Sequence, residues 1–80
     1  MADDFKYDVI KVLGQIGQES KGWKKEIKVI SWNERKPKVD IRPWSADGQK
    51  MGKGISLNKE ELTGLKKFLN ETDLETLDIE

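Results

Sequence analysis

Residues 23–32, WKKEIKVISW, and residues 38–44, KVDIRPW, decide the fold of this 80-residue chain. Both segments alternate apolar and polar side chains, as a strand does when one of its faces lies on a core, because successive strand side chains point to opposite faces. A polar loop that ends in Pro37 separates them, which predicts two neighbouring antiparallel strands. The expected core-facing residues are Ile27, Val29, Val39 and Ile41.

A further strand is predicted on each side of this pair. Residues 7–18 are rich in β-branched and apolar side chains, and Gly14 and Gly17 within them indicate a bulge or a bend. The segment 19–22 carries the turn residues of a hairpin and ends in a glycine that can adopt a positive φ. Residues 50–57 are expected to form a fourth strand with an irregular, glycine-rich start.

The last part of the chain predicts one helix. Asn58 is a good N-cap, and Glu61 three residues later completes the pattern of a capping box. The apolar stripe at helical spacing consists of Leu62, Leu65, Phe68 and Leu69. The expected fold is therefore α+β in one domain: a curved four-stranded antiparallel sheet over about 5–57, a helix over about 59–70 on one face of the sheet, and an acidic tail over 71–80.

The size and composition of the chain limit how this fold can be stabilised. A domain of 80 residues buries only about 60% of the surface that its unfolded chain exposes. The sequence has no Cys for a disulfide, and without His or Cys a zinc site would have to be built from carboxylates alone. No metal or cofactor is therefore expected, and the further stability is expected from association into a homodimer.

The first residues do not have the pattern of a secretion signal. Asp3, Asp4 and Lys6 precede any apolar run, whereas a signal peptide continues into an apolar stretch. No apolar stretch approaches the ~20 residues that cross a membrane. The sequence predicts a soluble, cytoplasmic protein with no membrane partner.

The formal net charge of zero is the sum of three blocks of different sign. Residues 1–20 hold two cations and four acids, residues 21–53 hold ten cations and four acids, and residues 54–80 hold three cations and seven acids. The middle block therefore has a net charge of +6 and lies between acidic ends. A basic block of this kind is often only a solvated surface, so its meaning depends on where its side chains point.

The polar side of the two central strands combines cations with tryptophans. Its members are Lys24, Lys28, Trp32, Lys38, Arg42 and Trp44, with Lys53 in the glycine-rich segment as a further cation. Cations attract phosphates, and flat aromatic rings stack on unpaired bases. Because duplex DNA hides its base faces and none of these side chains reads a base edge, the pattern predicts binding of single-stranded nucleic acid with little sequence specificity. Asp40 on the same side is expected to pair with Arg42.

Other interpretations of the same residues remain. Trp32 and Trp44 could instead belong to a second apolar core or a dimer interface, and the same face would also admit single-stranded RNA. A protein-interaction module that acts through the acidic helix and tail is a third hypothesis. Catalysis is not expected, because without His or Cys no nucleophile with its base is evident and the acids gather in the termini and the helix.

Two motifs resemble a family of transcriptional coactivators called positive cofactor four, and in particular its compact bacterial branch. They are Val39-Asp40-Ile41-Arg42, followed by Trp44, and Lys53-Gly54-Ile55-Ser56-Leu57-Asn58, followed by the amphipathic helix. The resemblance extends from about Gly22 to Leu69. It implies four strands and a helix, paired as a homodimer whose curved sheets bind single-stranded DNA in transcription, replication or repair, which would also allow association with a bacterial nucleoid.

The resemblance also implies which residues contact DNA. The residues of this chain that correspond to the family's contacts are Lys24, Arg42, Trp44 and Lys53. A further family aromatic, in the loop between the second and third strands, corresponds to Trp32 or to Asn33 depending on a shift of one residue. Trp32 is the expected stacking residue.

Overall fold

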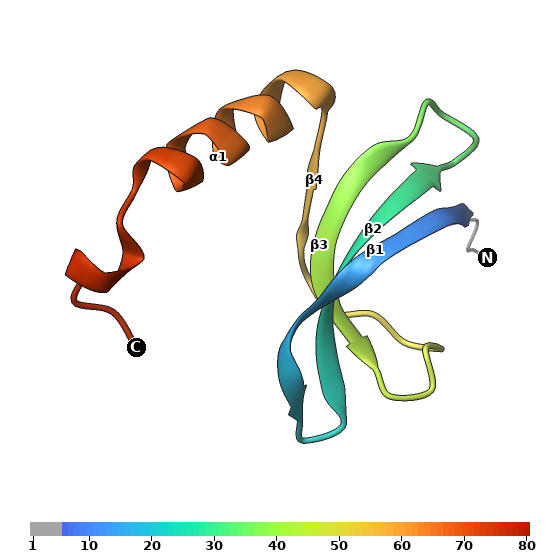
Figure 1. Cartoon of the computed structure of the whole chain (residues 1–80). Coiled ribbons are helices and arrows are strands. Elements are labelled where there is room, and N and C mark those ends of the chain that lie inside the picture. Colours follow the sequence, from blue (N-terminus) through green and yellow to red (C-terminus); the bar gives the residue numbers. More distant parts are fainter. Residues whose placement is uncertain (1–5) are drawn as a thin grey trace.

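The computed structural model describes residues 6–80. Asp3, Asp4 and Phe5, where the predicted sheet region begins, lie outside the described residues. The elements are β1 (Tyr7–Ser20), β2 (Trp23–Trp32), β3 (Lys38–Ser45), β4 (Ile55–Leu57), α1 (Lys59–Glu71) and a short 3-10 helix η1 (Leu74–Thr76). The strands form one antiparallel sheet in the order β1-β2-β3-β4, and α1 follows it (Figure 1). The predicted α+β fold of four strands and one helix is confirmed.

Two tight turns with left-handed backbone connect the first three strands. Lys21 and Gly22 have φ values of 54° and 81°, so the predicted hairpin turn with a positive-φ glycine is confirmed. Asn33 and Glu34, with φ values of 52° and 64°, turn the chain after β2. The side-chain oxygen of Asn33 accepts a hydrogen bond of 3.1 Å from the backbone N–H of Lys6, which joins this turn to the start of β1.

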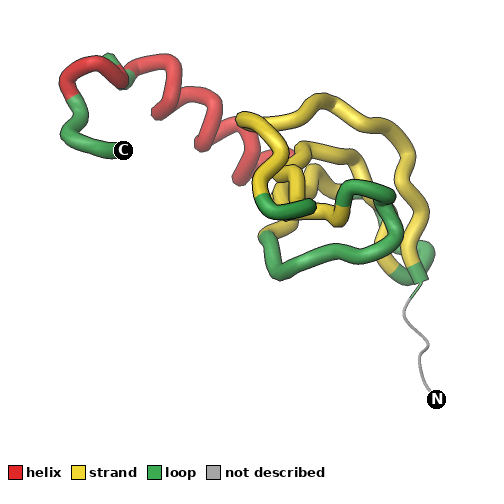
Figure 2. The backbone as a smooth tube through the Cα atoms, turned by 90° about the horizontal axis from the view of Figure 1, so that it is seen from below, coloured by secondary structure: helices red, strands yellow, loops and turns green. Residues whose placement is uncertain are grey.

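The sheet is strongly curled. The pairing of β1 with β2 shifts register at three places, including the stretches that contain Gly14 and Gly17, and Gly17 has a φ of 76°. Such bulges bend a strand and increase its twist. As a result the strands wrap around like a partly closed ring, which Figure 2 shows from below. The predicted bulge or bend in the first strand is thus confirmed.

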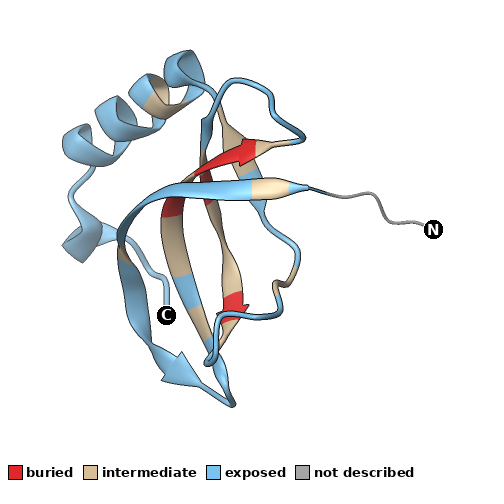
Figure 3. Cartoon of the chain, turned by 90° about the vertical axis from the view of Figure 1, so that its right-hand side faces the viewer, coloured by how far each residue is buried: buried red, intermediate tan, exposed pale blue. Residues whose placement is uncertain are grey.

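The most buried side chains lie inside this curl. Ile30 and Asp40 are 0% exposed and Trp44 is 1% exposed. All three lie on the sheet face that α1 does not touch, the inner face. Ile27 and Ile41 lie on the opposite, outer face and are only half-buried. Figure 3 shows that the buried segments belong to the strands of the sheet, whereas the helix is almost entirely exposed. The prediction that Ile27, Val29, Val39 and Ile41 face the core is therefore wrong for the single chain. The curled sheet lets the side chains of its inner face bury one another instead.

The fourth strand is shorter than predicted, since only Ile55–Leu57 pair with β3. Residues 46–54 form a loop that touches β3 through an isolated bridge between Trp44 and Met51. Gly54 brings this loop against β3: a Cβ added at Gly54 would lie 2.2 Å from the Cβ of Arg42 and 2.3 Å from the carbonyl oxygen of Ile41. Only glycine allows such a close approach of two backbones.

The helix begins with the predicted capping box. Asn58 accepts a hydrogen bond of 2.8 Å from the backbone N–H of Glu61, and the Glu61 carboxylate accepts one of 2.9 Å from the N–H of Asn58. From there α1 extends away from the sheet, contacting β3 and β4 at its start (Figure 1). A groove of about 320 Å³ remains between the helix and the outer face of the sheet. Its lining is mainly apolar: Ile27, Ile41, Leu62, Leu65 and Leu69, with Lys66 and Asn70.

Candidate nucleic-acid interface

The candidate interface is the inner face of the curled sheet. Register pairs in β2 and β3 place side chains that face each other on the same side: Lys24 opposite Trp44, Glu26 opposite Arg42, Lys28 opposite Asp40 and Ile30 opposite Lys38. Trp32, at the end of β2, continues this face. The structure therefore brings together on one face six of the seven residues predicted as the site, and Lys53 lies in the loop that precedes β4.

A buried ion pair lies at the centre of the inner face. Arg42 donates from Nε to Asp40 Oδ2 and from Nη2 to Asp40 Oδ1, both at 2.6 Å. The Asp40 side chain is fully buried, and the Arg42 side chain is 14% exposed. The expected pairing of these two residues is confirmed. A bidentate pair of this kind holds the guanidinium group in one plane and one direction.

The same carboxylate also anchors Trp32. The hydroxyl of Ser56 donates to Asp40 Oδ1 at 2.9 Å, and the indole N–H of Trp32 donates to the Ser56 hydroxyl oxygen at 3.1 Å. The Cζ atom of Arg42 lies 4.8 Å from the centre of the Trp32 ring. A cation at this distance from an aromatic ring is in the range of a cation–π contact. One buried carboxylate thus holds both an arginine and a tryptophan in contact with each other.

Lys28 and Trp44 form a deeper layer of the inner face. The ammonium group of Lys28 lies 3.5 Å from the centre of the Trp44 ring and 3.2 Å from Glu26 Oε1. Trp44 is 1% exposed and Lys28 is 8% exposed. The Trp44 ring therefore has almost no accessible surface, and the Lys28 ammonium group is already paired with Glu26. Burial and pairing distinguish these two residues from the exposed members of the predicted site.

The aromatic residues of the inner face form one cluster. The ring centre of Tyr7 lies 5.6 Å from that of Trp32 and 5.9 Å from that of Trp44, with the planes tilted by 44° and 54°. These distances are typical of favourable aromatic contacts. Trp32 is half-buried and borders this cluster. Sequence reasoning missed Tyr7, because its place depends on the register of β1 against β2.

Lysines surround the buried centre. Lys38 and Lys53 are exposed, and Lys24 is partly exposed, with its ammonium group 3.9 Å from Glu26 Oε2. A distance near 4 Å across a solvated surface gives only a weak ion pair. Of the predicted cations, these three therefore keep positive charge that a phosphate can reach.

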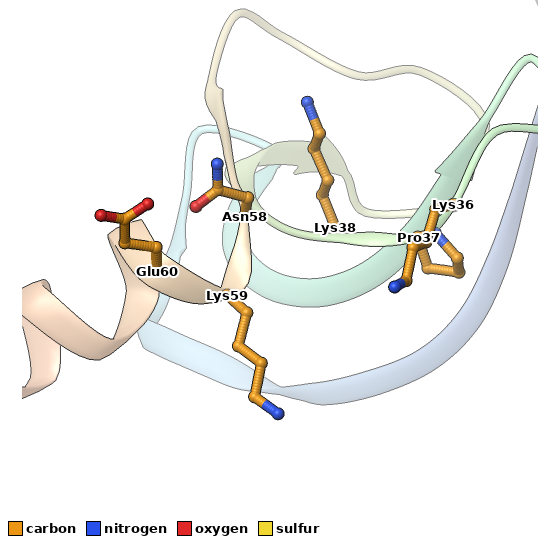
Figure 4. Close-up of a pocket in the computed structure, with 6 residues that line it drawn as sticks. All are labelled: Lys36, Pro37, Lys38, Asn58, Lys59 and Glu60. Carbon is orange, nitrogen blue, oxygen red and sulfur yellow. The ribbon is translucent and has the colours of Figure 1, made fainter.

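A pocket beside the inner face contains two lysines that sequence reasoning missed. It has a volume of about 470 Å³ and lies between the loop after β2 and the start of α1. Lys36, Lys38 and Lys59 line it, together with Pro37, Asn58 and Glu60. Figure 4 shows that the side chains of Lys38 and Lys59 extend in opposite directions. The pocket therefore does not direct three ammonium groups at one point, but it extends the cationic surface beyond Lys38.

Within residues 6–80, acidic side chains do not gather in groups of three or more that could hold a metal ion. In the same residues, every helix is too short or too polar to cross a membrane.

The chain is a small α+β module with a curled four-stranded sheet, one C-terminal helix, and aromatic and cationic side chains on its inner face. Sheet surfaces of this composition bind nucleic acids in other proteins. Comparison with known proteins identifies the family. Residues 20–68 match the family of the transcriptional coactivator p15 (PC4). The chain is also 45% identical over 73 residues to an uncharacterized protein of Treponema pallidum (strain Nichols), a match that covers 91% of this chain and 86% of the relative.

The chain therefore belongs to the PC4 family. The predicted resemblance is confirmed, because the matched range contains both motifs that carried it, the one around Arg42 and the one that begins at Lys53. The family consists of DNA-binding, coactivator-type proteins that bind single-stranded DNA and are not enzymes.

Proposed function

We propose that this protein binds single-stranded DNA with little sequence specificity on the inner face of its sheet. The observation that carries the proposal is the contact between Trp32 and Arg42, a half-buried aromatic ring and a guanidinium group held by a buried carboxylate within a border of lysines. Trp32 stacks on a base, and Lys24, Lys38 and Lys53 contact phosphates. Lys28 and Trp44 support this surface from below.

The charges of the inner face support this division of roles. Lys28 is paired with Glu26 and Arg42 with Asp40, so the four residues at the centre sum to a net charge of zero. The exposed lysines at the border carry the uncompensated charge. A strand can therefore run with its bases toward the aromatic centre and its phosphates along the border, which is how proteins without base readout hold single strands.

The role proposed in the cell follows from the class of ligand. Transcription, replication and repair all expose unpaired DNA, and this DNA lies in the cytoplasm, on the nucleoid. We propose that the protein acts there by binding separated strands.

The decisive experiment is a titration of a labelled oligo(dT) of about 20 nucleotides, followed by fluorescence anisotropy at low and moderate salt. We expect salt-sensitive binding that duplex DNA of the same length does not compete for. Oligo(rU) as a second competitor ranks DNA against RNA. Failure to bind oligo(dT) even at low salt would refute the proposal, and would favour a role of the acidic helix and tail in binding proteins.

Substitution of Lys53 by alanine is expected to flatten the salt dependence of binding. The slope of log K against log salt concentration falls by about 0.7 for every phosphate of a single strand that the protein no longer neutralises. Lys11→Ala makes the same charge change on the outer face, opposite Val29, and we expect it to leave the slope unchanged. The two slopes come from titrations at four or more salt concentrations, and equal slopes in Lys53→Ala and the wild-type protein would exclude the phosphate contact.

We also propose that two copies of the chain form a homodimer. The single chain leaves large apolar side chains exposed on β1 and α1, among them Ile10 at 58% and Phe68 at 64%. The groove between α1 and the outer face of the sheet is mainly apolar, and no side chain of the described residues 6–80 fills it. A second copy that covers these surfaces would supply the burial that a domain of this size otherwise lacks.

Substitution of Phe68 by glutamate is expected to weaken the dimer by a factor of about 30 or more, the effect of losing a central interface residue. Thr63→Glu is the matched control, because it makes the same change of charge at an exposed position of α1 outside the apolar stripe. Sedimentation equilibrium over a range of concentrations gives both dissociation constants. A wild-type protein that stays monomeric at micromolar concentrations would refute the dimer.

A further inference from the structure

We propose that Asp40 is a positioning residue that determines what Arg42 recognises. Asp40 cancels the charge of the guanidinium group and holds this group against Trp32. As a result Arg42 belongs to a base-stacking surface and does not contact a phosphate. This inference rests on the proposed binding of single-stranded DNA. It assigns to Arg42 a role different from the one that its positive charge predicts from sequence.

The first support is the direction of the hydrogen-bond donors of Arg42. Two of its N–H groups, on Nε and Nη2, point at the buried carboxylate of Asp40. Nη1 is turned toward the loop before β4, where the Gly52 carbonyl oxygen is 3.5 Å away and the Met51 sulfur 3.6 Å away. Most of the fork that would hold a phosphate is therefore directed into the protein.

The second support is the charge. Asp40 is completely buried, and both of its oxygens lie 2.6 Å from Arg42 nitrogens. Such a pair has no net charge, so a phosphate gains little by approaching it. At the border, Lys38 and Lys53 are exposed, and neither takes part in the ion pairs found among residues 6–80.

The third support is the way in which Asp40 reaches both members of the stacking pair. It binds Arg42 directly, and it binds Trp32 through the Ser56 hydroxyl. The backbone enforces this link, because Asp40 and Ser56 are directly opposed in the pairing of β3 with β4. The guanidinium group lies over the Trp32 ring, with Cζ 4.8 Å from the ring centre, so the two groups form a stacked pair. Guanidinium planes and indole rings both stack on bases.

The substitution Asp40→Asn tests the inference, since asparagine has nearly the same shape and keeps an oxygen that can accept from Arg42 or Ser56. The variant leaves the guanidinium charge uncompensated. We expect the slope of log K against log salt for oligo(dT) to become steeper by about 0.7, the value of one additional phosphate contact. Asp8→Asn is the matched control: it makes the same change at an exposed position opposite Ser31, and its slope should equal that of the wild-type protein.

A second probe separates base contacts from phosphate contacts. An abasic oligonucleotide of the same length has the phosphates of oligo(dT) without its bases. We expect the ratio of the affinities for oligo(dT) and for the abasic strand to fall at least about fivefold in Asp40→Asn, the low end of what one stacked base contributes. A residue that only stabilised the fold would weaken the binding of both probes and leave the slope unchanged.

The double variant Asp40→Asn/Arg42→Gln keeps the inference testable even if Asp40→Asn does not fold, because it removes both charges of the pair. We expect its salt slope to equal that of the wild-type protein. A slope about 0.7 flatter would show that Arg42 contacts a phosphate and would overturn the inference. An unchanged slope in a folded Asp40→Asn would also overturn it, whereas failure of the wild-type protein to bind oligo(dT) would refute the proposed function itself.

Discussion

Arg42→Ala is expected to lower the free energy of unfolding by about 3–5 kcal/mol, the usual effect of removing one partner from a buried ion pair. The reason is the complete burial of Asp40, whose two oxygens would each lose a charged donor at 2.6 Å. A protein of this size has a total stability of only about 5–15 kcal/mol, so the loss is a large part of it. Urea unfolding followed by circular dichroism measures the change.

Two variants separate the buried charge from other effects of losing the arginine. Arg35→Ala removes an exposed arginine from the loop after β2, and we expect it to change the stability by no more than about 0.5 kcal/mol. The double variant Asp40→Ala/Arg42→Ala removes the carboxylate as well, and we expect it to be more stable than Arg42→Ala alone. If Arg42→Ala were as stable as the wild-type protein, the buried pair of Asp40 and Arg42 could not contribute to stability as the geometry predicts.

Trp32→Ala is expected to weaken the binding of oligo(dT) by about 1–3 kcal/mol, since it removes the ring proposed to stack on a base. Trp32→Phe keeps an aromatic surface and should retain most of the affinity. Anisotropy titrations at a fixed salt concentration give the three dissociation constants. Because Trp32 also contacts Ser56 and Arg42, the fold of each variant is checked by thermal unfolding.

Trp23→Ala is the matched control for this experiment. Trp23 is 38% exposed and lies at the other end of β2, on the outer face of the sheet. We expect its removal to leave the affinity for oligo(dT) unchanged. Equal affinities of Trp32→Ala and the wild-type protein would contradict the stacking role of Trp32.

Local patterns were sufficient to predict most elements of the fold. The alternation in residues 38–44 identifies β3, and the pair Asn58 and Glu61 identifies the start of α1, because strand periodicity and helix capping depend on residues close in sequence. The positive φ of Gly22 and the bulge at Gly17 follow from glycine itself.

The depth of each side chain in the inner face could not be predicted in the same way. Alternation shows that Lys28, Trp32 and Trp44 share a face, but it does not show how strongly the sheet curls. The curl depends on bulges in β1, and it buries Trp44 and Lys28 while it leaves Trp32 partly accessible. Chemically similar residues on one face therefore have different accessibility, which only the three-dimensional arrangement reveals.

The hydrogen bond between Trp32 and Ser56 was equally out of reach of the sequence, because it joins residues 24 positions apart. The same Ser56 hydroxyl donates to Asp40, on the strand between them. The contact of Gly54 with Arg42 is of the same kind. The glycine in the motif Lys53-Gly54 could be recognised as a place of close backbone approach. Which segment it approaches depends on the pairing of β4 with β3.

The order of the strands has a consequence for how the chain reaches its folded state. Each strand of the sheet pairs with its neighbour in the sequence, from β1 through β4, without a crossover. Such nearest-neighbour pairing gives a low contact order for an all-antiparallel sheet, and low contact order favours fast folding. The inner face can therefore assemble by successive hairpin closures within one chain. Binding of a second copy or of a DNA strand would then follow folding and would not limit the folding rate.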